Sequence, residues 1–347
     1  MNDVVLSRTI STVETQPSHL SWREMPELNI AITGITGSLG TAISKYLLAN
    51  YGQSLRRLVG ISRKWQDQDR LRKELNNDFR LRLFIGDIRD YERLELAFNG
   101  IDFVIHAAAL KAITVCQYNP TEAIRTNIDG TENVLRAAKN CGVKKVLVIS
   151  SDKATQAGVN MYGATKAVVE NLTVAYNSYT GGNGTRYSVC RYGNVWGSSG
   201  SVVPLFLEQR NSGVLTLTNE YMTRFLITMA NAVKFILNSL EQMKGGEVFV
   251  PHLPSIKITD VAKTIAPDAK IETIGIRPGE RIHEIMLSPD EAYRTRDMGW
   301  AYVVAPQFPF WDREYDIGGS PVSAYWTYSS ASADRLSPND IKILLES

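Results

Sequence analysis

Cysteine and histidine are scarce in this chain, which has three cysteines and four histidines among 347 residues. The cysteines form no CxxC pair and the histidines are scattered, so we expect neither a disulfide framework nor a metal site. No apolar run reaches the roughly 20 residues of a membrane-spanning helix, and no secretory leader is visible. The net charge of +2 gives no sign of a nucleic-acid surface. These absences favour a cytoplasmic protein that binds neither membranes nor nucleic acids.

Apolar segments typical of buried strands alternate with segments of helical spacing along most of the chain. Because strand and helix follow one another repeatedly, the pattern predicts an α/β fold with a doubly wound parallel sheet of the Rossmann type. Strands are expected at 28–32, 57–61, 81–85, 103–109, 146–149 and 187–191. We expect an N-terminal arm at 1–26, a Rossmann domain at 27–195 with a later return near 222–252, a smaller and mainly substrate-binding domain at 196–304, and a C-terminal tail at 305–347.

The first predicted strand runs into the glycine-rich sequence TGITGSLG. A strand, a glycine-rich turn and a helix form the usual site for a dinucleotide's pyrophosphate, because small residues let the backbone approach it and the helix N-terminus offers free N–H groups. The spacing is GxxGxxG rather than the commoner GxGxxG, and an ordinary tight turn is the alternative. The candidate cofactor-binding residues here are Gly34, Thr36, Gly37, Ser38 and Gly40.

The second predicted strand is followed by Ser62, Arg63 and Lys64, where an NAD site would carry an acid to hold the ribose hydroxyls. A hydroxyl and two cations suit the 2′-phosphate of NADP, which Arg63 would pair, so we infer NADP rather than NAD. A solvated basic loop is the alternative. After the third strand come two further cofactor candidates, Asp87 and Ile88, of which Asp87 is placed either to contact the adenine amino group or to cap a helix.

The fourth predicted strand ends in small residues. Ala107 and Ala108 would leave room for the cofactor, and Lys111 at the mouth of the strand is a candidate contact for cofactor and substrate. His106, on the apolar strand itself, is expected to be a hydrogen-bonded core residue rather than a catalyst. A charged loop later in the chain has arginines suited to clamping a diphosphate, with a solvated turn as the alternative. The other substrate-binding candidates are Asn194, Arg224, Arg277 and Glu280.

The segment Val146–Lys166 concentrates the groups that can move protons. A continuously apolar strand ends at Ser151, Asp152 and Lys153, and the helix after it carries Tyr162 and Lys166, which share a face because they are four residues apart. A phenol has an ordinary pKa of about 10, and the ammonium of Lys166 would favour the phenolate, so we expect Tyr162 to act as a general base. A Tyr-x-x-x-Lys pair is common by chance, but it is a strong signal behind a glycine-rich turn and Ser-Asp-Lys.

Several motifs together resemble the extended short-chain dehydrogenase/reductases, and most of all the soluble, inverting UDP-N-acetylglucosamine 4,6-dehydratases of the polysaccharide-biosynthesis branch. They are TGITGSLG, HAAALK, TNIDGTENV, SSDKA, YGATK, RYGNVWGSSGSVVP and IRPGERIHE. Ser-Asp-Lys is the selective element, since glucose-type dehydratases carry Asp-Glu there and 4-epimerases carry neither. The resemblance implies an NADP-dependent lyase that acts on a UDP-sugar and forms a homo-oligomer through the helices of 121–140 and 162–176.

For this chain the resemblance implies catalysis by Ser151, Asp152, Lys153, Tyr162 and Lys166. Hydride would leave carbon 4 of the sugar for NADP while Tyr162 takes the hydroxyl proton. Lys153, if neutral, would then remove the proton at carbon 5 while Asp152 helps the carbon-6 hydroxyl leave as water. Hydride would return to carbon 6, with inversion at carbon 5. Burial beside the nicotinamide would lower the pKa of Lys153 and Asp152 would raise it, a balance that the sequence leaves open.

Two positions near the expected sugar pocket depart from the family pattern, which usually has His at Ala112 and Glu at Gln117. One alternative function is a UDP-sugar epimerase on the same scaffold, although simple 4-epimerisation needs no acid for the loss of water. Another is a non-catalytic NADP-binding regulator, which would be expected to lose Tyr162 or Lys166. Both residues are retained here.

Overall fold

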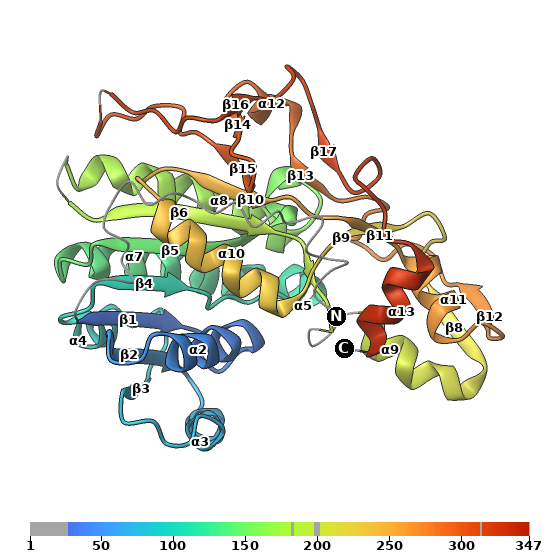
Figure 1. The fold of residues 1–347 in the computed structure, drawn as a ribbon, viewed down its shortest axis with the longest axis horizontal. Helices are drawn as coiled ribbons and strands as arrows, with labels where there is room; N and C mark the ends of the chain where they lie inside the picture. The colour runs from blue at the N-terminus through green and yellow to red at the C-terminus, as the bar shows by residue number, and fades with distance from the viewer. Residues whose placement is uncertain (1–26, 182–183, 198–201, 313, 347) are drawn as a thin grey trace.

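The structure is a computed structural model that describes residues 27–181, 184–197, 202–312 and 314–346; the arm predicted at 1–26 lies outside them. A ten-stranded sheet has the order β16-β14-β15-β10-β6-β5-β4-β1-β2-β3 (Figure 1). Neighbouring strands are parallel from β3 to β10 and antiparallel beyond β10. The strands are β1 (Leu28–Thr33), β2 (Leu55–Ser62), β3 (Leu81–Ile85), β4 (Phe103–His106), β5 (Lys145–Ser151), β6 (Arg186–Tyr192), β10 (Val248–Pro251), β14 (Thr295–Asp297), β15 (Ala301–Val304) and β16 (Ser320–Pro321).

Helices cover both faces of the parallel strands, as the predicted doubly wound sheet requires. On one face α2 packs against α10, and on the other α7 lies between α4 and α8 (Figure 1). The strands between them are continuously apolar because both faces are buried; Ile30, Leu147 and Val189 have no exposed surface. The helices are α2 (Ser38–Asn50), α3 (Trp65–Glu74), α4 (Tyr91–Phe98), α7 (Gly130–Asn140), α8 (Met161–Tyr176) and α10 (Met229–Gln242). No described helix is long and apolar enough to cross a membrane.

A second, smaller core lies beside the large sheet and is built around Phe206, Leu215, Val261 and Ile341 (Figure 1). The helix α13 near the C-terminus packs into this core, whereas β14, β15 and β16 extend the large sheet, so the last part of the chain serves both. The domain boundaries drawn from the sequence stay a prediction. The elements outside the large sheet are α9 (Val202–Gln209), β8 (Val214–Leu217), α11 (Ile258–Ile265), β12 (Lys270–Thr273) and α13 (Pro338–Glu346), with β7 (Asn194–Val195), β9 (Thr223–Ile227), β11 (Ser255–Lys257), β13 (Ile285–Leu287) and β17 (Tyr328–Ser329) in smaller sheets.

The helix expected at 121–140 is interrupted by a π-helical segment. It consists of α6 (Pro120–Ala123), the π-helix (Ile124–Asp129) and α7 (Gly130–Asn140). Within the π-helix, the amide of Asn127 bonds both the N–H and the C=O of Leu110, at 2.7 and 2.9 Å, and the hydroxyl of Thr165 at 3.0 Å. Local π turns are common where a helix must aim one side chain at a functional region. Apolar spacing does not reveal such a contact.

The fourth strand is shorter than predicted and ends at His106 rather than at 109. Its partner β1 ends at Thr33, directly opposite His106, so pairing on that side stops there, although β5 on the other side continues to Ser151. The ring of His106 bonds the hydroxyls of Thr33 (2.7 Å) and Thr131 (3.0 Å) and is 1% exposed. Burial lowers its pKa to about 3. The prediction of a hydrogen-bonded core histidine is confirmed.

A buried arginine with two glutamates joins the sheet to the elements around the strand ends. Arg191 of β6 lies 2.5 Å from Glu170 of α8 and 2.8 Å from Glu291 of α12 (Pro289–Ala292). Ser150 of β5 donates a further hydrogen bond to Glu170 (2.5 Å), and Arg191 donates one to the carbonyl of Met286 (2.7 Å). Burial alone would raise the pKa of Glu291, but Arg191 lowers it to about 2. Arg191 therefore links β5, β6, α8 and the segment 286–291.

We predict that Arg191→Met lowers the free energy of unfolding by about 3–5 kcal/mol, because it leaves two carboxylates buried without their cation. Urea denaturation at neutral pH measures this loss. The matched control is Arg70→Met, because Arg70 forms an exposed ion pair with Asp67 and its loss should cost less than about 1 kcal/mol. Equal losses in the two variants would contradict the role given to Arg191.

Candidate active site

The segment after β5 turns sharply and brings α8 close to the end of the strand. A short 3₁₀ helix (Asp152–Gln156) follows β5, and α8 begins where the side chain of Asn160 accepts a 2.8 Å hydrogen bond from the N–H of Gly163. A Cβ on Gly163 would lie 2.5 Å from the carbonyl oxygen of Lys153, so only glycine permits this approach. Parallel strands end at one edge of the sheet, which is where ligands bind in such folds.

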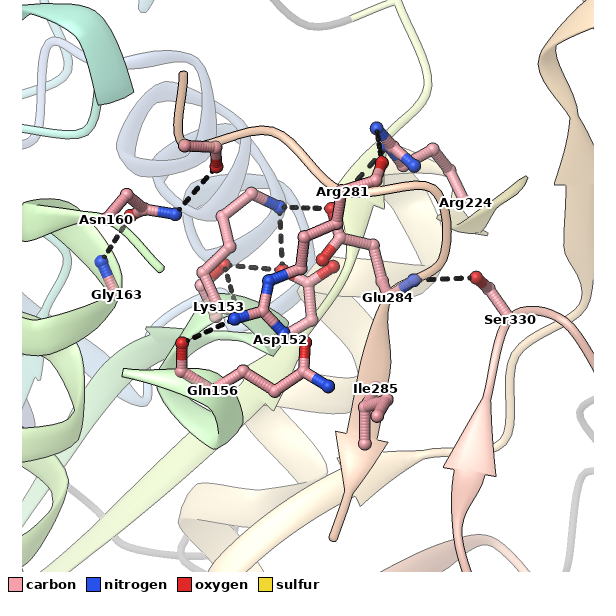
Figure 2. Close-up of polar contacts among 12 residues, drawn as sticks. Asp152, Lys153, Gln156, Asn160, Gly163, Arg224, Arg281, Glu284, Ile285 and Ser330 are labelled. Atoms are coloured by element: carbon pink, nitrogen blue, oxygen red, sulfur yellow. Dashed lines mark hydrogen bonds and ion pairs between the residues drawn. The ribbon is translucent and has the colours of Figure 1, made fainter. Parts of the chain in front are cut away.

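The amine of Lys153 lies between two carboxylates from distant parts of the chain (Figure 2). Its Nζ is 3.0 Å from Oδ1 of Asp152 and 3.4 Å from Oε1 of Glu284, whose side chains are 0% and 5% exposed. Ser151 donates a 2.7 Å hydrogen bond to the same Oδ1, whereas Oδ2 of Asp152 is buried with no hydrogen-bond partner among the described residues. Buried carboxylate oxygens are normally hydrogen-bonded, so Oδ2 is the atom of this cluster best placed to meet a polar ligand.

These two carboxylates determine the charge of Lys153. Burial by itself would lower the pKa of the ammonium, but Asp152 and Glu284 outweigh burial and raise the pKa above its ordinary value, while Arg224 acts weakly in the lowering direction. The sequence leaves open whether burial or Asp152 determines the pKa of Lys153; in the structure the carboxylates prevail, and the charged amine is favoured. For Lys153 to act as a base, a proton must first leave it, and Asp152 at 3.0 Å is the nearest acceptor.

Tyr162 and Lys166 lie on the buried face of α8, as their spacing predicts, and are 8% and 5% exposed. The Nζ of Lys166 donates a 2.6 Å hydrogen bond to the carbonyl of Ile149, and burial lowers the pKa of Lys166 to about 8. Burial raises the pKa of Tyr162 to about 12, opposed by the positive charge of Lys153 and a hydrogen bond with Ser151. In the protein alone, the positive charge of Lys153 therefore favours the phenolate. The contribution of Lys166, which the four-residue spacing predicts, stays a prediction.

The loop of residues 277–285 is held against the 3₁₀ helix and the start of α8 (Figure 2). Arg224 of β9 donates hydrogen bonds to backbone carbonyls of this loop. Side chains of the segment 155–160 donate hydrogen bonds to backbone carbonyls of residues 279 and 285, and Arg281 donates one in the opposite direction. Glu284 is brought to Lys153 by these contacts. The hydrogen bonds are Arg224 to the carbonyls of Arg281 (2.9 Å) and Ile282 (3.0 Å), Arg281 to the carbonyl of Gln156 (2.7 Å), Asn160 to the carbonyl of Gly279 (3.0 Å) and Thr155 to the carbonyl of Ile285 (2.7 Å).

The glycine-rich turn after β1 packs against the end of β4. Gly34 has a φ of +72°, and a Cβ there would lie 2.9 Å from Cα of Ala108. This backbone conformation and this close approach both require glycine. The N-cap residue of α2 is Gly37, which has no side chain to accept hydrogen bonds from the first N–H groups of the helix. Such a helix N-terminus suits the binding of an anion. The predicted cofactor residues Gly34, Thr36, Gly37, Ser38, Gly40, Ala107 and Ala108 belong to these adjoining segments.

Arg63 and Asp87 lie near each other where β2 and β3 end. Arg63 is exposed, and its charge contributes to a lowered pKa of Asp87. Burial would raise the pKa of Asp87, but hydrogen bonds from Arg89, whose Nη2 is 2.8 Å from Oδ2, reverse the effect. The sequence left two roles open for Asp87. The role of helix cap is wrong, because Asp90 is the N-cap of α4. The adenine contact stays a prediction.

The predicted substrate-binding residues lie in three different settings. Within the part of the chain that the structure describes, Oδ1 of Asn194 and Oε2 of Glu280 are buried without a hydrogen-bond partner, which suits side chains that bind a polar ligand. Lys111 and Arg277 are exposed. The guanidinium of Arg224 donates hydrogen bonds to the backbone of the loop and so positions the segment that carries Glu284. Its contact with the substrate stays a prediction.

Sequence reasoning missed the roles of Glu284 and Gln68 in shaping the site, and it gave no structural contact for Gln117 or Ile88. Glu284 ends the motif IRPGERIHE, but nothing local shows that it pairs with Lys153. Gln68 is buried and its amide bonds both the hydroxyl and the carbonyl of Ser62, at 3.0 Å each, so it orders the turn after β2. Gln117 accepts a 3.1 Å hydrogen bond from the N–H of Met161 at the start of α8. Ile88, predicted to contact the cofactor, is buried and adjoins α7 at Gly130.

Comparison with known families establishes the relationship. The model of a family described as polysaccharide biosynthesis protein matches residues 30–306, most of the chain. The chain belongs to this family. A protein from Campylobacter jejuni strain 81-176, named UDP-N-acetylglucosamine 4,6-dehydratase (inverting), is 45% identical over 87% of this chain and 92% of its own length. A Rickettsia prowazekii protein named UDP-glucose 4-epimerase is 37% identical over 91% of this chain and 94% of its own length.

Solved structures confirm the predicted extended short-chain dehydrogenase/reductase fold. Pen from Bacillus thuringiensis superimposes with a TM-score of 0.85 at 32% identity, over 93% of this chain and 98% of its own. DesIV from Streptomyces venezuelae, a dTDP-glucose 4,6-dehydratase solved with NAD and TYD bound, gives a TM-score of 0.65 at 20% identity, over 74% of this chain and 87% of its own. The second likeness shows the fold alone.

Proposed function

We propose that the protein is a nucleotide-sugar 4,6-dehydratase that converts UDP-N-acetylglucosamine to a UDP-4-keto-6-deoxy sugar with inversion at carbon 5. The observation that carries the proposal is the pair formed by Asp152 and Lys153, 3.0 Å apart and electrostatically coupled to Tyr162. Elimination of water needs a base at one carbon and an acid at the next, and this pair supplies both. The Campylobacter relative, at 45% identity, bears the name of this activity.

The residues of the chain account for the protons that move in the oxidation at carbon 4 and in the loss of water. A bound nicotinamide dinucleotide supplies the hydride acceptor and donor. Tyr162 takes the proton of the carbon-4 hydroxyl, and Lys166 and Ser151 assist it. When a proton passes from Lys153 to Asp152, the amine becomes a base and the carboxyl group an acid. Lys153 then removes the proton at carbon 5, Asp152 protonates the carbon-6 hydroxyl, and the C6–O bond breaks as water leaves. The products of this step are an ammonium and a carboxylate, the ion pair of the structure.

An epimerase is the second candidate, because Rickettsia relatives at 36–37% identity are named UDP-glucose 4-epimerase. Epimerisation at carbon 4 loses no water and gives the pair of Asp152 and Lys153 no task. The pair therefore favours the dehydratase. Within the site, Asn194, Glu280, Lys111, Arg224 and Arg277 are the proposed contacts of the UDP-sugar.

NADP is the proposed form of the cofactor. The uncapped N-terminus of α2 suits the pyrophosphate, and the hydroxyl and cation of Ser62 and Arg63 suit a 2′-phosphate. Tyr162 and Lys166 are placed to contact the nicotinamide half, since they lie on the face of α8 beside the end of β5. The remaining proposed contacts are Gly34, Thr36, Gly37, Ser38, Gly40, Asp87, Ile88, Ala107, Ala108 and Lys111.

A homo-oligomer in the cytoplasm is the proposed working state. Apolar side chains on the outer face of the helices are consistent with an interface, since Ile124 and Val168 are 40% and 47% exposed. Both residues lie in the two helical segments from which the sequence predicts association.

We predict that Lys153→Ala abolishes dehydration but leaves cofactor affinity within about twofold, because the proton transfer proposed for the amine belongs to the elimination. Reduced nicotinamide should then accumulate when UDP-N-acetylglucosamine is added, since oxidation at carbon 4 still proceeds. Absorbance and product chromatography measure the two steps. The control is Lys73→Ala, which removes an exposed lysine paired with Asp69. Normal turnover by Lys153→Ala would rule out the proposed base.

Arg63→Ala is expected to weaken NADP binding by about tenfold or more while NAD binding changes little, because a charge-assisted pair with the 2′-phosphate is lost. Titration calorimetry with both dinucleotides measures the preference. The matched control is Arg70→Ala, because Arg70 is also an exposed arginine but lies within α3 and not in the turn after β2. An unchanged preference in Arg63→Ala would mean that the turn after β2 does not select the cofactor.

Sedimentation velocity at micromolar protein should show a dimer or larger species, and Val168→Glu should shift it toward the monomer, because a charge buried in an apolar interface is costly. Val159→Glu, a change at another exposed valine outside the two helical segments, is the control. A monomer at every concentration would exclude the proposed association.

A further inference from the structure

Glu284 is anchored by its backbone and by its side chain. Its N–H donates a 2.9 Å hydrogen bond to the hydroxyl of Ser330, and its carbonyl accepts one of 2.9 Å from the N–H of Ser330. Nε of Arg224 lies 3.5 Å from Oε1, and the residue is 4% exposed. The carboxylate is therefore a negative charge with a set position, held by residues of β9 and of the turn after β17, both outside the segment of Asp152 and Lys153.

We propose that Glu284 is the positioning residue of the dehydration step: its anchored carboxylate holds the Lys153 amine beside Asp152 and keeps it charged until a proton passes to Asp152. The inference rests on the proposed function and adds a residue to it. A lysine has a flexible four-carbon stem. Asp152, the residue before Lys153 in the chain, offers only one ionic contact, which by itself would leave the amine free to move around it. The second carboxylate, 3.4 Å from Nζ, restricts the amine to the space between the two.

Charged and titratable groups from several elements face this amine. Asp152 belongs to the same 3₁₀ helix, Tyr162 comes from α8, and Arg224 comes from β9. Arg281, in the loop before Glu284, interacts with both carboxylates. Glu284 is thus a carboxylate from outside the 3₁₀ helix that attracts the ammonium of Lys153. It offsets the repulsion between that ammonium and the guanidinium of Arg224.

The position of Glu284 suits the direction in which charge moves during elimination. Lys153 gains a proton from carbon 5 and becomes an ammonium ion as the bond breaks. A carboxylate already in place 3.4 Å away stabilises that developing charge without reorganising. The same contact holds the nitrogen at one point relative to the substrate, and misplacement by about 1 Å can cost 100-fold in rate.

The test measures the reactivity of Lys153 without any substrate. Acetic anhydride at alkaline pH acylates only neutral amines, and mass spectrometry of the digested protein gives the extent at each lysine. In Glu284→Gln, Lys153 should react about tenfold faster or more than in the unmodified protein, because loss of an adjacent opposite charge favours the neutral amine. Glu284→Asp, which keeps the charge on a shorter side chain, should give a smaller increase.

Thr155→Val is the matched control, because it removes the bond between the 3₁₀ helix and the carbonyl of Ile285 but no charge. Lys153 should stay as unreactive in this variant as in the unmodified protein. An equal rise in Thr155→Val and Glu284→Gln would show loosening of the loop and would overturn the proposal, as would an unchanged Lys153 in a folded Glu284→Gln protein. If Glu284→Gln does not fold, an unchanged Lys153 in Glu284→Asp would overturn it.

Turnover separates this inference from the proposed function. With UDP-N-acetylglucosamine, Glu284→Gln should still reduce the bound nicotinamide but should lose at least about tenfold in kcat for water loss, with KM nearly unchanged, as for a residue that acts only in the elimination. Unchanged kcat would contradict the positioning role. An unmodified protein that dehydrates no sugar would refute the proposed function, whereas the acylation result would still decide the contact between Glu284 and Lys153.

Discussion

The contact of one buried lysine with two carboxylates is the interaction on which the account of this protein depends. Asp152 adjoins Lys153 in the chain, whereas Glu284 comes from the loop between β12 and β13. Burial of an amine normally favours its neutral form, and the two carboxylates reverse this effect. The pair of Asp152 and Lys153 can therefore exchange one proton to become acid and base, and the loss of water restores the starting ion pair.

The rest of the fold keeps this arrangement in place by means of two arginines, one buried and one partly buried. Arg191 joins β6 to α8 and to the segment of Glu291, so the helix that carries Tyr162 cannot move independently of the sheet. Arg224 performs the same task for the loop, through the carbonyls of residues 281 and 282. Both guanidinium groups have several donors in a rigid plane, which suits a residue that must hold separate segments together. Chemistry at the strand ends thus rests on contacts between segments far apart in sequence.

Much of this architecture can be predicted from local sequence, because the signals are local. The apolar strands, the glycine-rich turn and the four-residue spacing of Tyr162 and Lys166 all follow from short periodicities. The pairing of Lys153 with Glu284 and the bond of Asn127 to Leu110 join distant segments, and no pattern of spacing reveals them. The raised pKa of Tyr162 could not be predicted from local sequence for the same reason, since the position of Lys153 and the depth of burial exist only in the folded chain.

The measurement that tests this account most directly is an NMR time course of the purified protein with UDP-N-acetylglucosamine in deuterated water. The account predicts a 4-keto-6-deoxy sugar nucleotide with deuterium at carbon 5 and inverted configuration there, because Lys153 removes that proton and the carbon is reprotonated from the opposite face. Epimerisation at carbon 4, with carbon 6 still hydroxylated and no deuterium incorporated at carbon 5, would contradict the assignment of Asp152 and Lys153 as the acid and base of an elimination.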